Sequence, residues 1–193
     1  MKKLAILSVF CLWPIAAFAG GNTSTYTKFD LDRCRQVEPG DEYVYGGTWA
    51  CKGIKGYDII ISNADDRDLV GFGSIADDQC SRHKTFGRFN TALSPVEWRM
   101  KGGKPIAAIE RWRVTTDDEG GSVTWLVVSA LRPNESCHVH FVAGSYPNAN
   151  EAARRAADDL AEDFDCETDV PTVDSKVGPP PINMDACKDV ARE

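Results

Sequence analysis

The segment Ser136–Cys166 constrains the fold more than any other part of the sequence. A strand-like run over Cys137–Ser145 passes through a Pro-Asn turn into an amphipathic helix, and a cysteine stands at each end. The strand would span about 26 Å at roughly 3.3 Å per residue, and a helix from Ala149 to Cys166 would return about 26 Å at roughly 1.5 Å per residue. An antiparallel helix would therefore bring Cys166 back beside Cys137, and we predict a disulfide between them.

The first 19 residues have the pattern of a signal peptide. Lys2 and Lys3 precede the apolar run Leu4–Trp13, and Ala17–Ala19 forms a small-residue cleavage signal. The apolar run is too short to span a bilayer, so we expect no membrane anchor after cleavage. The sequence predicts export to the periplasm or the medium, where cysteines form disulfides.

Six of the seven cysteines follow the expected cleavage site, and none belongs to a C-x-x-C pair. An even number in an exported chain predicts a disulfide framework, although spacing alone leaves many connectivities open. Cys34 and Cys51 are plausible partners because a Pro-Gly turn separates them. With Cys137 and Cys166 paired, elimination leaves Cys80 with Cys187.

The chain is acidic, with a formal net charge of −7 and no block of basic residues. This charge disfavours nucleic acid and anionic lipid as partners, and it favours a cationic protein. We find no nucleotide-binding glycine fingerprint and no nucleophile motif, so we expect no cofactor and lean toward a protein that is not an enzyme. Acidic pairs such as Asp77-Asp78 and Asp117-Asp118 fall in turns, where we expect solvated carboxylates.

Strand patterns recur along the chain, and turn residues separate them. The expected strands are Tyr43–Ala50, Tyr57–Ile61, Asp68–Phe72, Val96–Met100, Pro105–Thr115, Ser122–Leu131 and Cys137–Ala143. Short polar turns join the last four, which predicts an antiparallel meander. The predicted fold class is α+β: an antiparallel β-sheet meander with one C-terminal amphipathic helix packed on it, held by three disulfides. Asn148 and Glu151 have the spacing of a capping box at the start of that helix.

We expect a single domain over residues 20–166, beginning with a loose polar arm over 20–28. Residues 74–94 show weak periodicity and predict a long loop, and a loop of that length is uncommon unless it is functional or pinned. Residues 167–193 contain Pro179-Pro180-Pro181 and few aromatic side chains. They predict an extended tail that Cys187 pins to the domain.

Tryptophan and arginine recur together on strands expected to be neighbours. These residues are Trp98, Arg99, Arg111 and Trp112, and Asp66 and Arg67 stand at a turn that could belong to the same rim. Such a combination suits a contact surface for a protein or a platform for a saccharide. The alternative is a sheet with its tryptophans on the core face and its arginines on the solvent face.

The most metal-like cluster is the Cys-His-Val-His run at Cys137–His140. His138 and His140 are expected to share one strand face and could chelate a transition metal, with His83 or a loop carboxylate as third ligand. The alternative is a strand with two exposed or hydrogen-bonded histidines. If Cys137 is in a disulfide, only the two histidines remain for chemistry.

Several short motifs stand out along the chain: WACKGIKGYD at Trp49–Asp58, DDR at Asp65–Arg67, VEWR at Val96–Arg99, AAIERW at Ala107–Trp112, and a C-H-V strand followed by an Asn-Ala-Asn helix ending in F-D-C. Through these motifs the chain, over about residues 30–166, resembles a group of uncharacterised exported proteins from alphaproteobacteria. The resemblance implies export and an α+β fold, and it implies no known activity. It also implies that the cysteines matching Cys34, Cys51, Cys137 and Cys166 belong to the group's common pattern.

The sequence therefore predicts an exported, non-enzymatic binding or interaction module that uses the Trp/Arg sheet face or the 74–94 loop. One concrete form is an inhibitor of a cationic hydrolase such as lysozyme, and a saccharide is the other partner considered. The alternative function is a metal-binding protein or metal-dependent enzyme centred on His138 and His140.

Overall fold

The computed structural model describes residues 21–41, 45–76, 79–116 and 120–190. The expected signal peptide over residues 1–19, the start of the first expected strand at Tyr43, and the acidic pairs Asp77-Asp78 and Asp117-Asp118 lie outside these residues. No helix among the described residues is long and apolar enough to cross a membrane.

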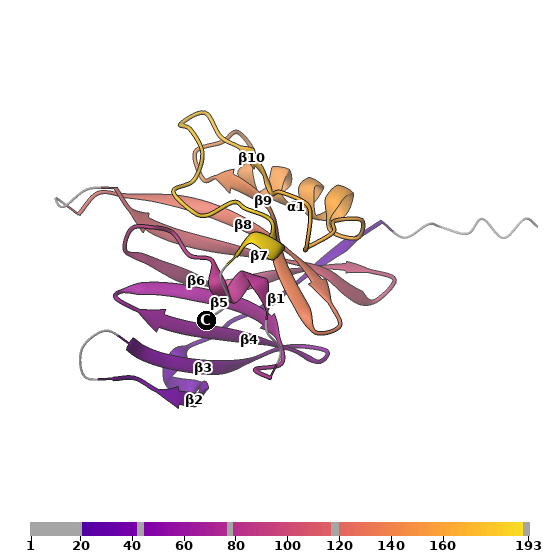
Figure 1. Cartoon of the computed structure of the whole chain (residues 1–193). Coiled ribbons are helices and arrows are strands. Elements are labelled where there is room, and N and C mark those ends of the chain that lie inside the picture. The colour runs from indigo at the N-terminus through magenta and orange to yellow at the C-terminus, as the bar shows by residue number, and fades with distance from the viewer. Residues whose placement is uncertain (1–20, 42–44, 77–78, 117–119, 191–193) are drawn as a thin grey trace, which may run out of the picture.

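The described residues form a mixed, mostly antiparallel β-sheet with one α-helix (Figure 1). The strands are β1 (Thr23–Thr27), β2 (Arg35–Pro39), β3 (Tyr45–Ile54), β4 (Tyr57–Ala64), β5 (Arg67–Gly73), β6 (Asn90–Lys101), β7 (Lys104–Thr115), β8 (Ser122–Arg132), β9 (Glu135–Ala143) and β10 (Thr172–Asp174). The helix α1 spans Ala149–Leu160, and short 3-10 helices occupy Leu31–Arg33, Cys80–His83 and Cys187–Asp189.

The strands lie in two layers, which appear one above the other in Figure 1. The order β10-β9-β8-β7-β6 continues through β5-β4-β3-β2, and β1 pairs with β6 off this path. Between β5 and β6 the only pairing is one parallel register, Arg67 with Asn90, so the sheet folds over at this point. The meander β6-β7-β8-β9 is antiparallel as expected, whereas the β5–β6 and β9–β10 pairs are parallel.

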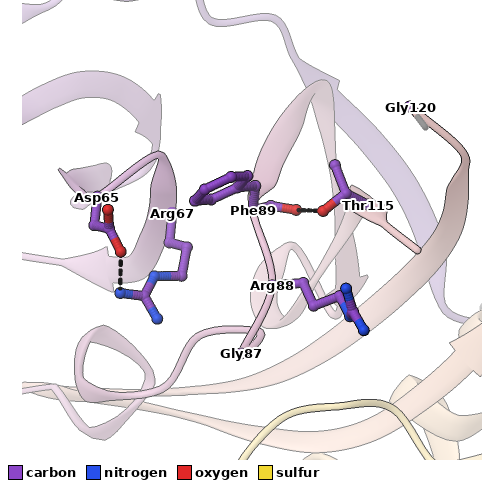
Figure 2. A pocket seen from close by; sticks show the side chains of 7 residues that line it. All are labelled: Asp65, Arg67, Gly87, Arg88, Phe89, Thr115 and Gly120. Carbon is purple, nitrogen blue, oxygen red and sulfur yellow. Dashed lines mark hydrogen bonds and ion pairs between the residues drawn. The ribbon is translucent and has the colours of Figure 1, made fainter. Parts of the chain in front are cut away.

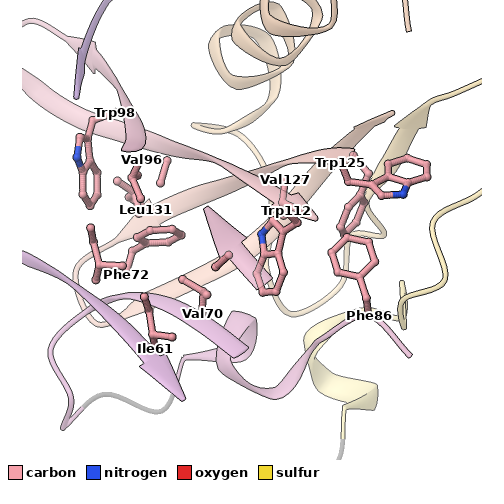
Figure 3. Packing of buried hydrophobic residues seen from close by; sticks show 14 of the residues in the cluster. Ile61, Val70, Phe72, Phe86, Val96, Trp98, Trp112, Trp125, Val127 and Leu131 are labelled. Carbon is pink, nitrogen blue, oxygen red and sulfur yellow. The ribbon is translucent and has the colours of Figure 1, made fainter. Parts of the chain in front are cut away.

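The main core fills the space between the two layers (Figure 3). Phe72 of β5 meets Trp98 of β6 edge to face, with ring centroids 5.5 Å apart. Phe86, from the segment before β6, packs against Trp112 and Phe141. Aromatic rings from both layers therefore hold the layers together, each contributing large apolar area and an oriented ring contact.

The helix α1 covers the outer face of β7, β8 and β9, where a second apolar cluster forms. Ala152, Ala153 and Ala157 are buried in this contact, so the alanine stripe lets the helix lie close to the sheet. The capping prediction was wrong: the backbone of Asn148 is left-handed (φ 53°), and its side chain makes no capping hydrogen bond. The α-helix also ends at Leu160, six residues before Cys166.

The three disulfides predicted from the sequence are present in the structure. They are Cys34–Cys51, Cys80–Cys187 and Cys137–Cys166. Although α1 is shorter than expected, the turns after it carry Cys166 to a Cα–Cα distance of 5.8 Å from Cys137.

Both ends of the described chain are more ordered than the sequence predicted. The expected loose arm over residues 20–28 contains β1, which pairs antiparallel with β6 from Thr23 with Met100 to Thr27 with Val96. The tail adds β10 as a parallel strand beside β9. Each segment forms a strand because its backbone groups pair with those of an existing sheet edge. Such pairing needs no apolar alternation in the segment itself, so the sequence did not predict these strands.

Candidate ligand-binding pocket

The tryptophans of the predicted Trp/Arg face lie in the core. Trp98 and Trp112 are 0% and 1% exposed, so neither ring can contact a partner at the surface. Side chains alternate along a strand, and the even-numbered positions of β6 and β7 point between the two layers. The alternative reading, with tryptophans on the core face, is the one that the structure shows.

The arginines of that predicted face point to the helix side. Arg99 is 6% exposed and makes two bonds to the carboxylate of Asp158 on α1, at 2.9 and 2.6 Å. Arg111 is half-buried and donates to the Oδ1 atom of Asn150 at 2.7 Å. Paired, mostly buried guanidiniums of this kind fix the helix to the sheet, which is a structural role.

The two histidines lie on opposite faces of β9, so the expectation that they share one face was wrong. A β-bulge sets His138 opposite Ser129 but His140 opposite Val128, which breaks the strand alternation between the two histidines. The His138 ring packs edge to face on Phe141 in the main core, and burial and the charge of Lys84 lower its pKa to about 3.

His140 has different surroundings. Its Nδ1 atom lies 2.6 Å from the hydroxyl of Thr172 and its Nε2 atom 3.5 Å from the carboxylate of Asp174, both on β10. Within the described ranges, no group of three or more His, Cys, Asp or Glu side chains has the arrangement of a metal site. The geometry therefore favours histidines that serve the fold.

A pocket lies at the end of the two layers where the β4–β5 turn meets the segment before β6 (Figure 2). Its volume is about 720 Å³, which is within the range of small-molecule sites. The lining residues are Asp65, Arg67, Gly87, Arg88, Phe89, Thr115 and Gly120. Arg67 belongs to the predicted site and Phe89 to the predicted 74–94 loop, so this pocket unites two parts of the sequence hypothesis.

The buried side chain of Asn90 holds the pocket wall in place. Its amide nitrogen donates to the carbonyl oxygens of Phe86 and Arg88, at 3.1 and 2.8 Å. Its amide oxygen accepts from the backbone N–H of Asp68 at 3.1 Å. The backbone N–H of Asn90 donates to the carbonyl oxygen of Asp66. Asn90 thus ties the segment before β6 to β5 through its side chain and to the β4–β5 turn through its backbone.

The functional groups in the pocket combine charge with an apolar ring. Arg67 donates to the Asp65 carboxylate at 2.8 Å, and both side chains are partly exposed. Phe89 is 53% exposed, and its carbonyl oxygen accepts from the hydroxyl of Thr115 at 3.1 Å. The Arg88 side chain is exposed and makes no hydrogen bond or ion pair with the described residues. Figure 2 shows the Phe89 ring and Arg67 on one side of the segment from Gly87 to Phe89, and the Arg88 side chain extending to the other side.

Sequence reasoning singled out Arg67 but missed Arg88, Phe89 and Thr115. The length of the 74–94 segment was the available signal, because such segments are functional or pinned. Asp66, also in the predicted site, is exposed at the turn, and its backbone rather than its side chain holds Asn90.

Asp68 of β5 and Glu110 of β7 are buried carboxyl groups whose charges interact. Burial raises the pKa of Asp68, although Asn63 and the Ala92 N–H donate to its carboxylate at 2.8 and 2.9 Å. Burial, and then the charge of Asp68, raise the pKa of Glu110 well above its usual value. The Oε1 atom of Glu110 has no hydrogen-bond partner among the described residues, so this carboxyl is best accommodated in its neutral form.

Comparison of the chain with protein-family models, with curated proteins and with solved structures finds no match. The likeness to exported alphaproteobacterial proteins therefore stays a resemblance.

Proposed function

We propose that this is an exported binding protein whose 720 Å³ pocket takes a saccharide bearing a carboxylate group. The observation that supports the proposal is that the half-exposed ring of Phe89 lines the same pocket as Arg67 and Arg88. A sugar ring presents an apolar face that packs on an aromatic ring, and a guanidinium matches a carboxylate with two parallel hydrogen bonds. The carboxylate of Asp65 and the hydroxyl of Thr115 supply groups that hydrogen-bond to sugar hydroxyls.

Rigidity supports a binding role for this pocket. Asn90 fixes the segment that carries Arg88 and Phe89, and the N–H of Gly87 donates to the carbonyl oxygen of Pro181 in the tail at 2.7 Å. A wall held in this way loses little conformational entropy when a ligand binds, which favours affinity.

The proposal is tested by calorimetric titration of the mature protein with a uronic-acid oligosaccharide and with the neutral oligosaccharide of the same length. We expect binding of the acidic ligand alone, and Arg88→Gln to weaken it about tenfold, because a charge-assisted pair contributes roughly 1.5 kcal/mol. Phe89→Ala should weaken it by a similar factor, whereas Arg113→Gln, an exposed arginine outside the pocket lining, should leave it unchanged. Equal binding of both oligosaccharides, or none of either, would contradict the proposal.

Export belongs to the same proposal. The three disulfides are consistent with an oxidising compartment, and the first 19 residues have the composition of a signal peptide. N-terminal sequencing of the secreted protein should find Gly20 at its start.

The acidic charge of the chain supports a cationic protein as a second class of partner. The net charge of −7 would attract a basic hydrolase such as lysozyme, and inhibition that weakens with added salt is the expected result. An unchanged lysozyme rate in the presence of excess protein would remove this candidate. A metal-dependent function is not proposed, because the bulge in β9 separates His138 from His140.

A further inference from the structure

The disulfide Cys34–Cys51 differs from the other two in its surroundings. Cys34 is partly exposed, whereas the four cysteines of the other two disulfides are each at most 8% exposed. Cys34 and Cys51 both line a second pocket of about 450 Å³, between the segment after β1 and the strand β3. A small molecule in this pocket would therefore contact a disulfide.

The same pocket is locally basic in an acidic protein. Lys28, Arg33 and Lys52 line it, and Asp30 is the one acidic residue of the lining. Arg33 lies 3.6 Å from the Asp30 carboxylate, and both side chains are largely exposed. The four side chains sum to a charge of +2, three positive and one negative, against −7 for the whole chain.

We propose that this pocket is a site of covalent modification, at which a small thiol carrying a carboxylate exchanges with the Cys34–Cys51 disulfide. The lysines and arginine attract the carboxylate and place the thiol beside the exposed cysteine. Cationic surroundings also stabilise thiolates, both the attacking one and the one that leaves.

The exchange proceeds at the accessible sulfur. The thiolate of the small molecule attacks the Sγ atom of Cys34, the Cys34–Cys51 bond breaks, and Cys51 leaves as a thiolate that takes a proton from solvent. The incoming sulfur is oxidised and Cys51 is reduced, so the number of disulfide bonds stays the same. Attack at Cys51 is disfavoured because that residue is 1% exposed.

The test compares three thiols of similar size and different charge: 3-mercaptopropionate, 2-mercaptoethanol and cysteamine. Each is applied at an equal concentration of thiolate, free cysteines are trapped by alkylation, and adducts are located by peptide mapping. We expect the adduct on Cys34, with the anionic thiol reacting about fivefold faster than the cationic one, as two nearby charges in water would give. The net negative charge of the whole chain would instead favour the cationic thiol. A faster reaction of the anionic thiol would therefore be caused by the charges of the pocket.

Variants assign the preference to the named residues. Lys28→Gln combined with Lys52→Gln should abolish the charge preference without changing the circular dichroism spectrum, since both side chains are exposed. Lys176→Gln removes an exposed charge far along the chain and should preserve it. The proposal is overturned if cysteamine reacts fastest, if no thiol modifies Cys34, or if the double variant keeps the preference.

Discussion

At the scale of single residues, the main core holds ionisable groups that respond to pH in opposite directions. The folded-state pKa of Glu110 is raised. The contribution of the Glu110 side chain to stability is therefore complete below its unfolded pKa, about 4.3, where the carboxyl is neutral in both states. That contribution is lost as pH rises through the folded pKa. The pKa of His138 is lowered to about 3, so its contribution is complete above about 6.5 and is lost as pH falls toward the folded value.

Glu110→Gln should therefore stabilise the protein increasingly as pH rises. At pH 8 we expect a gain in unfolding free energy of roughly 1 to 3 kcal/mol, the range for relief of an unsatisfied buried group, and little gain at pH 4. Urea unfolding of variant and wild type at both pH values measures the difference. A gain that is the same at pH 4 and pH 8 would show that the Glu110 carboxyl does not titrate as described.

His138→Phe should reduce the loss of stability in acid. Because the histidine pKa falls from 6.5 to about 3 on folding, its protonation in the unfolded chain removes as much as roughly 4 to 5 kcal/mol between these pH values. The phenyl ring keeps an aromatic contact with Phe141 while removing the titration. Acid unfolding followed by tryptophan fluorescence should show the variant unfolding at lower pH, and an unchanged midpoint would refute the assignment.

At the scale of elements, strands with an apolar alternation could be predicted from sequence, and strands formed by edge pairing could not. The strands β6 to β9 alternate and were expected, and the pairing of Cys137 with Cys166 followed from strand and helix lengths. The strand β1 and the bulge near Val139 have no local signature, because pairing partners elsewhere in the chain determine them. The loose arm and the shared face of the histidines were therefore wrong predictions of this kind.

The pocket was predictable only in part for the same reason. A turn containing Arg67 and a long segment before β6 were visible in the sequence. The contact between them depends on Asn90, which bonds to both segments. The residues next to Asn90 in the sequence do not predict its hydrogen-bond partners.

The close approach of α1 to the sheet gives a prediction at this scale. Ala157→Leu should destabilise the protein by roughly 1 to 3 kcal/mol, because Ala157 is 0% exposed and a larger side chain overpacks the contact. Asp159→Leu, an exposed position on the same helix, is the matched control and should change stability by less than about 0.5 kcal/mol. Thermal unfolding by circular dichroism measures both, and equal effects would mean that the helix does not lie as close as described.

At the scale of the whole molecule, the disulfides differ in how much of the chain they constrain. Cys80–Cys187 closes a separation of 107 residues and Cys34–Cys51 one of 17 residues. In the chain-entropy model these correspond to about 4.7 and about 3 kcal/mol. Replacing Cys80 and Cys187 with serine should therefore lower the melting temperature more than the same change at Cys34 and Cys51. The reverse order in calorimetry would contradict the model.

The pairing of Cys80 with Cys187 also has a consequence for biogenesis. If the chain is exported from its N-terminus, as proposed above, Cys137 and Cys166 reach Cys80 before Cys187 arrives. An oxidant that joins cysteines in their order of appearance would form Cys34–Cys51 correctly and then trap Cys80 with Cys137. Formation of the native disulfides therefore requires an export pathway that includes an enzyme able to rearrange disulfides. Production in a host without such an enzyme should yield a mixture of disulfide isomers in which Cys34–Cys51 is the most frequent native bond.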